Sequence, residues 1–246
     1  MSFDGQRVVV IGASAGIGEA AARAFAARGA AVTITGRSKD RLDQAAQRIP
    51  HPVLAAELDA TSREALDAFF ATTGTIDHLV LAASPGAAGI GPIAALDEAT
   101  LRQAFDGKFF AHVKAIQAAL PQLRHDGSVT IITAATARAA FPGTAGIAAV
   151  NGALETMVAP LAVELAPLRV NAVSPGVIDT HWWKAMPEDQ RRAYFESVAA
   201  VSPVRRVGKP DDVAGAIVYL AGAGFITGIV LECTGGSNLT AAALAS

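Results

Sequence analysis

Short apolar runs alternate along the chain with longer amphipathic segments that are rich in alanine. Several of the short runs are continuously apolar, which is typical of strands covered on both faces. We expect strands at residues 8–12, 31–35, 52–58, 76–82, 128–133, 168–173 and 229–233. We expect helices at residues 16–28, 40–48, 62–71, 98–123, 146–165 and 210–220. Since alternating strands and helices form parallel sheets through right-handed crossovers, the pattern predicts an α/β fold. Its centre would be a doubly wound, seven-stranded parallel sheet with helices on both faces.

The chain has 246 residues, and no linker rich in serine, proline or charge interrupts this pattern. We therefore expect a single domain covering residues 1–246. Mean hydropathy is +0.37, and residues 78–96 and 213–231 carry no Asp, Glu, Lys or Arg. Glycines interrupt both stretches and prolines the first, so we interpret them as buried strands and helices rather than membrane spans. With no signal-like N-terminus, we expect a soluble, cytoplasmic protein.

Charge and cysteine content narrow the possible partners. Twenty basic side chains oppose 22 acidic ones, which leaves a net charge of −2. This balance favours neither nucleic acid nor an anionic membrane surface as a partner. Cys233 is the single cysteine, so the chain has no internal disulfide framework, and the five histidines lack metal-ligand spacing. We expect no metal site.

A glycine-rich turn links the first predicted strand to the first predicted helix. It contains Gly12, Ser14, Gly16, Ile17 and Gly18. Glycines in this position let the backbone approach a pyrophosphate, which is then held by the free N–H groups at the helix start. The alternative is a tight turn that binds nothing. Its place after an apolar strand and before a helix favours dinucleotide binding.

The spacing of these glycines resembles that of the short-chain dehydrogenase/reductase family, and further motifs extend the resemblance over most of the chain. They are Leu58-Asp59-Ala60-Thr61, Leu161-Ala162-Val163-Glu164-Leu165-Ala166, Arg169-Val170-Asn171, Val173-Ser174-Pro175-Gly176-Val177-Ile178-Asp179-Thr180 and Thr234-Gly235-Gly236. The resemblance implies a single Rossmann-type domain that binds NAD(P) and transfers hydride between a carbonyl and an alcohol. It also implies that Asp59 contacts the adenine ring and that residues 173–180 contact the nicotinamide.

The end of the second predicted strand bears on which nicotinamide cofactor is used. An acidic residue there would accept from the ribose 2′-OH of NAD, whereas Arg37 and Ser38 suit the 2′-phosphate of NADP. Ala15 counts against this view, because many NADP-using relatives carry a basic residue there. We expect NADP(H) to be favoured over NAD(H). The predicted cofactor-binding residues are Gly12, Ser14, Gly16, Ile17, Gly18, Arg37, Ser38, Asp59, Ala60, Ala82, Ala83, Lys108, Pro175, Gly176, Ile178 and Thr180.

The resemblance fails at the reaction centre, where the family normally has Ser, Tyr, Lys and Asn. Following the family's spacing, these positions hold Ala134, Ile147, Asn151 and Lys108. Neither Ala134 nor Ile147 can exchange a proton. The catalytic residues are therefore unknown, and the usual proton donor is predicted to be absent.

Lys and Asn look exchanged between two helices, so an ammonium could still lie beside the nicotinamide ribose. Lys108 and Asn151 are therefore catalytic candidates, and burial could lower the pKa of Lys108 enough for acid–base work. The alternative is that Lys108 is an exposed residue or a salt-bridge partner. Thr133 is a further candidate, and Thr136 could also orient a substrate or a water molecule.

Three functions remain open from the sequence. The first is an NADP(H)-dependent oxidoreductase acting on an unknown carbonyl or alcohol through a non-standard site. The others are a nucleotide-binding sensor without turnover, and an isomerase or lyase that reuses the pocket. The apolar pairs Phe109-Phe110 and Met157-Val158, with the tail Leu239–Ser246, also predict self-association as a homotetramer or dimer.

Overall fold

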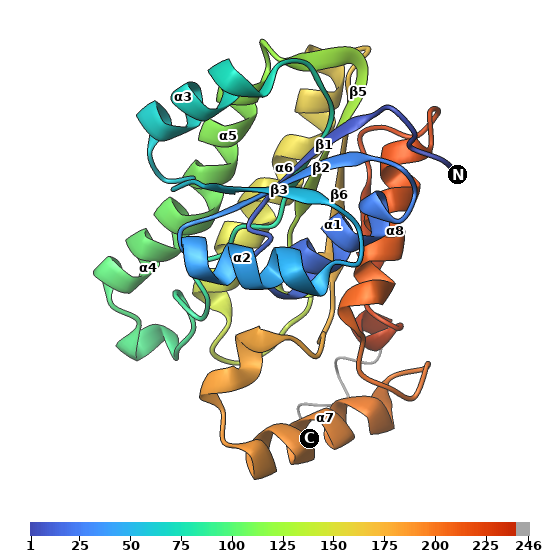
Figure 1. Cartoon of the computed structure of the whole chain (residues 1–246). Coiled ribbons are helices and arrows are strands. Elements are labelled where there is room, and N and C mark those ends of the chain that lie inside the picture. Colours follow the sequence, from blue (N-terminus) through green and yellow to red (C-terminus); the bar gives the residue numbers. More distant parts are fainter. Residues whose placement is uncertain (240–246) are drawn as a thin grey trace.

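Seven parallel strands form one sheet in the computed structural model, which describes residues 1–239 (Figure 1). The strands are β1 (Arg7–Ile11), β2 (Ala31–Gly36), β3 (Val53–Glu57), β4 (Ile76–Leu81), β5 (Leu123–Ile132), β6 (Arg169–Pro175) and β7 (Val230–Cys233). Their order is β3-β2-β1-β4-β5-β6-β7, and every neighbouring pair is parallel. The predicted fold class is confirmed. Because the strands are parallel, their carboxyl ends meet along one edge of the sheet, and the loops that leave them lie together.

Two layers of helices cover the two faces of this sheet. One layer consists of α1 (Gly16–Ala26), α2 (Lys39–Arg48) and α8 (Pro210–Gly222). The other consists of α3 (Arg63–Thr73), α5 (Ala111–Ala119) and α6 (Ala145–Glu164). Side chains of β1 alternate between the layers: Val8 and Val10 face the first, while Val9 and Ile11 face the second. This alternation explains the continuously apolar strands, since both faces of each strand are buried.

The predicted helix at residues 98–123 is wrong in two details. It divides into α4 (Glu98–Ala104), a π-helical turn at Phe105–Phe110 and α5. Gly107 lies in the π turn against Pro85, and a Cβ on Gly107 would come within 2.6 Å of the Pro85 Cβ. The helix also ends at Ala119, because Leu123 already pairs with Ile76 as the start of β5.

The helix α7 (Glu188–Val201) has no counterpart among the predicted elements. Only Val198 of this helix is buried, so its sequence carries little of the apolar periodicity that predicts a helix. Figure 1 shows α7 apart from both helical layers, beyond the loop that follows β6.

Helix α6 alone, within residues 1–239, is long and apolar enough to cross a membrane, by length and composition. Core helices of other proteins pass the same test, and α6 packs against β6 in the second layer. The cytoplasmic location therefore stays a prediction.

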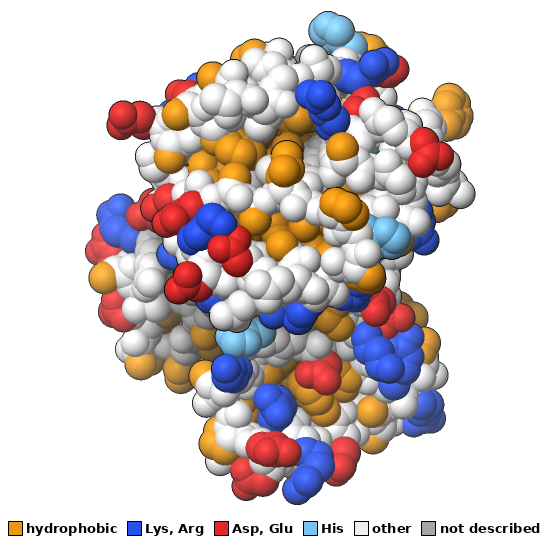
Figure 2. All heavy atoms as spheres, viewed as in Figure 1, with side chains coloured by type: hydrophobic (Ala, Val, Ile, Leu, Met, Phe, Trp, Pro, Cys, Tyr) orange, Lys and Arg blue, Asp and Glu red, His pale blue; other side chains and the backbone are white. Residues whose placement is uncertain are grey.

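On the face shown in Figure 2, acidic and basic side chains are interspersed rather than gathered by sign.

Candidate cofactor site and reaction centre

Two glycines of the turn after β1 have no room for a side chain, Gly12 because the end of β4 lies against it and Gly18 because the turn folds back on Gly12. Gly12 has a φ of 86°, and a Cβ on it would lie 2.5 Å from the amide nitrogen of Ala83. A Cβ on Gly18 would overlap the carbonyl oxygen of Gly12. The backbone amide of Ala82 donates to the carbonyl of Ile11 at 2.8 Å, which ties the ends of β1 and β4 together. Backbone atoms therefore line this narrow turn at both glycines.

The first turn of α1 suits an anion. No side chain caps this helix, whose N-cap residue is Ala15, so the N–H groups of its first turn are left for another acceptor. Across the turn, a Cβ on Gly16 would lie 3.5 Å from the Cβ of Thr180, so the loops after β1 and β6 meet there. These residues fit the pyrophosphate of a dinucleotide.

Three predicted adenosine contacts lie after the ends of β2 and β3. Arg37 is exposed, and Ser38 caps α2 by accepting from the amide of Arg41 at 3.4 Å. The Oδ1 atom of Asp59 accepts from the amide and the hydroxyl of Thr61, at 2.9 and 2.8 Å. Hydrogen bonds from Thr61 are the main reason that the pKa of Asp59 is lowered, and the charge of Arg37 adds to the effect. The charge of Arg37 therefore acts on Asp59, which indicates that these two predicted contacts lie on the same side of the site.

Of the remaining predicted cofactor residues, Ala60 follows β3 and is buried, and Lys108 lies in the π-helical turn. The others lie where β4 and β6 end. Ala83 follows β4, and its carbonyl accepts from the Nε2 atom of His112 at 3.1 Å. Pro175 ends β6, and the amide of Gly176 donates to the carbonyl of Cys233 at 3.1 Å. Ile178 is buried. These contacts hold two loops at the same edge of the sheet as the glycine turn.

Lys108 projects from the π-helical turn into the interior and is 8% exposed. Its Nζ atom donates to the Oδ1 atom of Asn151 at 2.7 Å and to the carbonyl of Thr133 at 3.3 Å. Burial lowers the pKa of Lys108 to about 8, while the charge of Glu155 opposes the shift. The structure thus brings together the two residues that look exchanged, and Lys108 is not a surface residue.

The amide of Asn151 is held from both ends. Its Nδ2 group donates to the hydroxyl oxygen of Thr136 at 3.1 Å and to the carbonyl of Ile147 at 2.9 Å. Thr136 accepts this bond, so its own hydroxyl hydrogen remains to be donated, and no acceptor for it is found within residues 1–239. The hydroxyl of Thr133, by contrast, donates to the Oε1 atom of Glu155 at 2.8 Å. Of the two threonines, Thr136 has the available hydroxyl.

Sequence reasoning missed two buried groups near Lys108, Glu155 and His112, and also the ion pairs that the exposed Arg138 makes. Glu155 is 8% exposed and also accepts from the Nε atom of Arg138 at 2.9 Å. Arg138 in turn donates to Glu232 of β7 at 3.1 Å. His112 is fully buried, and burial is the main reason that its pKa is lowered to about 3. The helical spacing from Lys108 to His112 and from Asn151 to Glu155, four residues each, was the signal available.

Ala134 and Ile147, at the predicted Ser and Tyr positions, are partly buried. The chain's two tyrosines lie on other elements: Tyr219 is half exposed on α8, and Tyr194 of α7 packs against Trp183 with ring centres 5.1 Å apart. Residues 1–239 contain no group of three His, Cys, Asp or Glu side chains that could hold a metal ion.

Taken together, the parallel sheet and the glycine turn at its carboxyl edge define a Rossmann-type nucleotide-binding protein. The family model described as enoyl-(acyl carrier protein) reductase matches residues 12–238. A short-chain dehydrogenase/reductase from Stachybotrys chlorohalonatus is 33% identical, and the match covers 96% of this chain and 98% of that protein. The galactitol 2-dehydrogenase (L-tagatose-forming) of Cereibacter sphaeroides is 32% identical, with 95% of each chain covered. The chain belongs to the short-chain dehydrogenase/reductase family of oxidoreductases.

Solved structures agree with this assignment. A small-chain dehydrogenase in complex with NADPH is 30% identical and superimposes with a TM-score of 0.83, over 96% of this chain and all of the other. The MalC reductase/Diels-Alderase from Malbranchea aurantiaca is 26% identical with a TM-score of 0.89, over 96% of this chain and 98% of that one. Members of this family bind nicotinamide cofactors, as the first of these complexes does.

Proposed function

We propose that the protein is an NADP(H)-dependent oxidoreductase that interconverts a carbonyl and an alcohol at a non-standard reaction centre built on Lys108. The observation that carries the proposal is the buried contact between Lys108 and Asn151, at the sheet edge that also holds the glycine turn. Relatives named as dehydrogenases and a structural neighbour bound to NADPH support the redox chemistry.

In this proposal the chain acts as one nucleotide-binding domain. The glycine turn and the N-terminus of α1 hold the pyrophosphate, while Asp59 contacts the adenine. Arg37 pairs with the 2′-phosphate through charge-assisted hydrogen bonds, which favours NADP(H) over NAD(H). The bound nicotinamide would supply or accept the hydride. Residues 175–180 would line the nicotinamide end of the site.

Reduction of a carbonyl also requires a proton on the substrate oxygen. Ala134 and Ile147 carry no exchangeable proton, whereas the ammonium of Lys108 does. Because its pKa is about 8, Lys108 exists in both protonation states near neutral pH, as a general acid or base should. We assign the proton transfer to Lys108, whose flexible side chain can leave Asn151 for the substrate oxygen. The free hydroxyl hydrogen of Thr136 would hold that oxygen in place.

A binding protein without turnover is the second candidate, because apolar side chains occupy the positions where the family's Ser and Tyr are expected. The two functions separate in one assay. Purified protein that binds NADPH is incubated with a panel of ketones, aldehydes and enones, and the loss of NADPH absorbance is followed. We expect slow turnover with some members of the panel, since loss of a general acid typically costs about 10²–10⁴-fold rather than all activity.

The residue assignment is tested in the same assay. Lys108→Met should bind NADPH and lose turnover, and Thr136→Val should lose turnover that Thr136→Ser retains. Lys209→Met, which removes an exposed lysine on the other helical layer, is the matched control. No turnover by the wild-type protein across the panel, with NADPH bound, would reject the redox proposal in favour of the binding protein. Turnover that survives Lys108→Met would leave the oxidoreductase and reject Lys108 as its proton donor.

A further inference from the structure

A chain of hydrogen bonds connects buried Lys108 to a charge pair that reaches the surface. The Nζ atom of Lys108 donates to the carbonyl of Thr133, and the hydroxyl of the same threonine donates to Glu155. On its far side, Glu155 accepts from Arg138 at 2.9 Å, and the Arg138 side chain is 47% exposed. Thr133 therefore touches both the ammonium and the carboxylate, and it fixes their separation.

From this geometry we infer that Glu155 and Arg138 are positioning residues that set the protonation state of Lys108. Glu155 supplies the negative charge that keeps a buried ammonium tolerable in the interior. Arg138 draws part of that charge away, so the ammonium is stabilised only partly. The inference rests on the proposed function in one respect, namely that the proton on Lys108 is the one used in turnover.

Few other charged groups face Lys108 from the surrounding elements. His112 of α5 is neutral at ordinary pH, since burial and the charge of Lys108 lower its pKa to about 3. Asn151 and Glu155 face it from α6, and Asn151 carries no charge. Glu232 of β7 is further off, on the other side of Arg138. Glu155 is thus the one carboxylate within residues 1–239 that acts on the pKa of Lys108.

Neutralising one or the other member of the Glu155–Arg138 pair should shift the pKa of Lys108 in opposite directions. Removing the negative charge with Glu155→Gln should lower its pKa by about one pH unit or more, because an opposite charge close by favours the ammonium. Removing the competing cation with Arg138→Gln should raise it. A purely structural role for the pair would not produce two shifts of opposite sign.

The protein has five lysines, so isotope labelling of lysine gives a simple NMR spectrum in which each side chain can be titrated. The signal of Lys108 is the one that disappears in Lys108→Met. We would follow its midpoint against pH in the wild type, Glu155→Gln and Arg138→Gln. Glu164→Gln is the control, because it makes the same change at an exposed position of the same helix and should leave the midpoint in place.

A midpoint that is the same in all folded variants overturns the inference. If Glu155→Gln does not fold, Arg138→Gln decides alone, because its side chain is half exposed and its loss leaves the interior packed. The titration needs no substrate, so it separates the two proposals. Shifted midpoints without turnover would uphold the charge pair and reject the proposed function. Unshifted midpoints together with turnover that depends on Lys108 would uphold the proposed function and reject the role of the charge pair. With both upheld, the pH profile of turnover should move with the NMR midpoint.

Discussion

Burial of Lys108 should make the stability of the fold depend on pH in the alkaline range. Its pKa falls from 10.5 in an exposed lysine to about 8 in the folded protein. Because the folded pKa is the lower one, folding disfavours the ammonium. That penalty is fully present below pH 8 and disappears as the pH rises to 10.5. At about 1.4 kcal/mol for each unit of pKa, the wild type should gain about 3 kcal/mol across this range.

Lys108→Met provides the reference, because methionine has similar length and no charge. It removes the ammonium and its penalty, but it leaves the Asn151 oxygen and the Thr133 carbonyl without their donor, at a cost of about 1–3 kcal/mol for each. The two effects nearly offset each other below pH 8, so the variant should be about as stable as the wild type there. At pH 10.5 the wild type should be more stable by about 3 kcal/mol.

Urea unfolding followed by circular dichroism measures both proteins at a series of pH values. The quantity of interest is the difference in unfolding free energy, since the titrations of other groups are common to both proteins and cancel. A difference that stays constant from below pH 8 to above 10.5 would mean that Lys108 has an ordinary pKa and is accessible to water. The reasoning about its burial would then be refuted, and with it the argument that Lys108 is poised for acid–base catalysis.

Three further predictions concern the cofactor turn, the choice of cofactor and assembly. Gly18→Ala should lower the free energy of unfolding by about 1–3 kcal/mol and weaken NADPH binding, because the added Cβ would push the Gly12 carbonyl out of the turn. The control Gly215→Ala, which has open space around it in α8, should instead raise the free energy of unfolding by about 0.5–1 kcal/mol. Equal melting temperatures for the two variants would contradict this. Arg37→Ala should weaken NADPH by about 1.5–3 kcal/mol in calorimetry while Arg28→Ala does not, and an equal loss for NADH would reject the 2′-phosphate contact. Self-association should appear in light scattering as a mass above the 25.0 kDa of one chain, since Phe110 is 45% exposed and only a third of the apolar stretch of α6 is buried; a mass of 25.0 kDa at micromolar concentration would exclude the homotetramer and dimer.

One of the residues predicted to lie at an assembly surface is buried within the chain. Val158 is fully buried in the second layer, so it packs within the chain rather than between copies. The C-terminal tail from residue 240 onward lies outside the described residues. The exposed apolar face of α6, which includes Val163 at 81% exposure, is the surface that best supports self-association.

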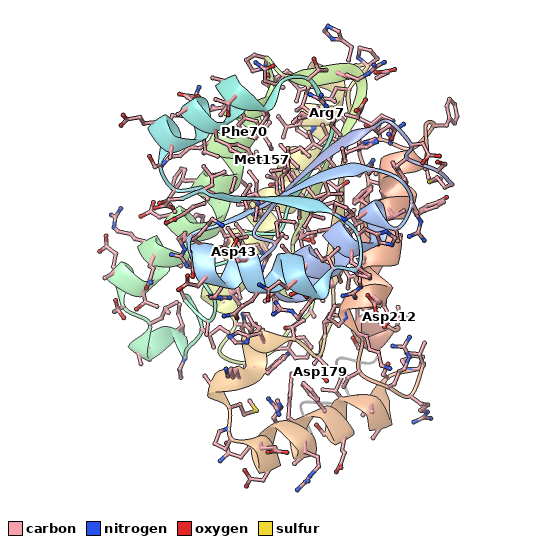
Figure 3. The ribbon with its side chains drawn as sticks, viewed as in Figure 1. Arg7, Asp43, Phe70, Met157, Asp179 and Asp212 are labelled. Atoms are coloured by element: carbon pink, nitrogen blue, oxygen red, sulfur yellow. The ribbon has the colours of Figure 1, made fainter. Side chains whose placement is uncertain are left out.

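The sequence alone determined the seven strands, their alternation with the helices that cover the sheet, and the position of the cofactor turn, because these depend on local chemistry. Alternation of apolar strands with amphipathic helices leaves few ways to bury every apolar face. Phe70 of α3 is one example: it is buried in the core between α3 and the second face of the sheet (Figure 3). Gly12 and Gly18 were recognisable for a similar reason: only glycine fits a turn in which two backbone segments approach so closely.

Tertiary structure alone decided how the reaction centre is arranged. Lys108 and Asn151 are 43 residues apart in the chain, and their hydrogen bond depends on a π turn that the helical pattern does not announce. Packing also decided which threonine keeps a hydroxyl hydrogen to donate. The hydroxyl of Thr133 donates to Glu155, whereas that of Thr136 only accepts from Asn151. Hydrogen bonds of this kind need donor–acceptor distances of roughly 2.7–3.2 Å and a nearly linear angle at the hydrogen. That geometry is set by how β5, α5 and α6 pack rather than by the residues themselves.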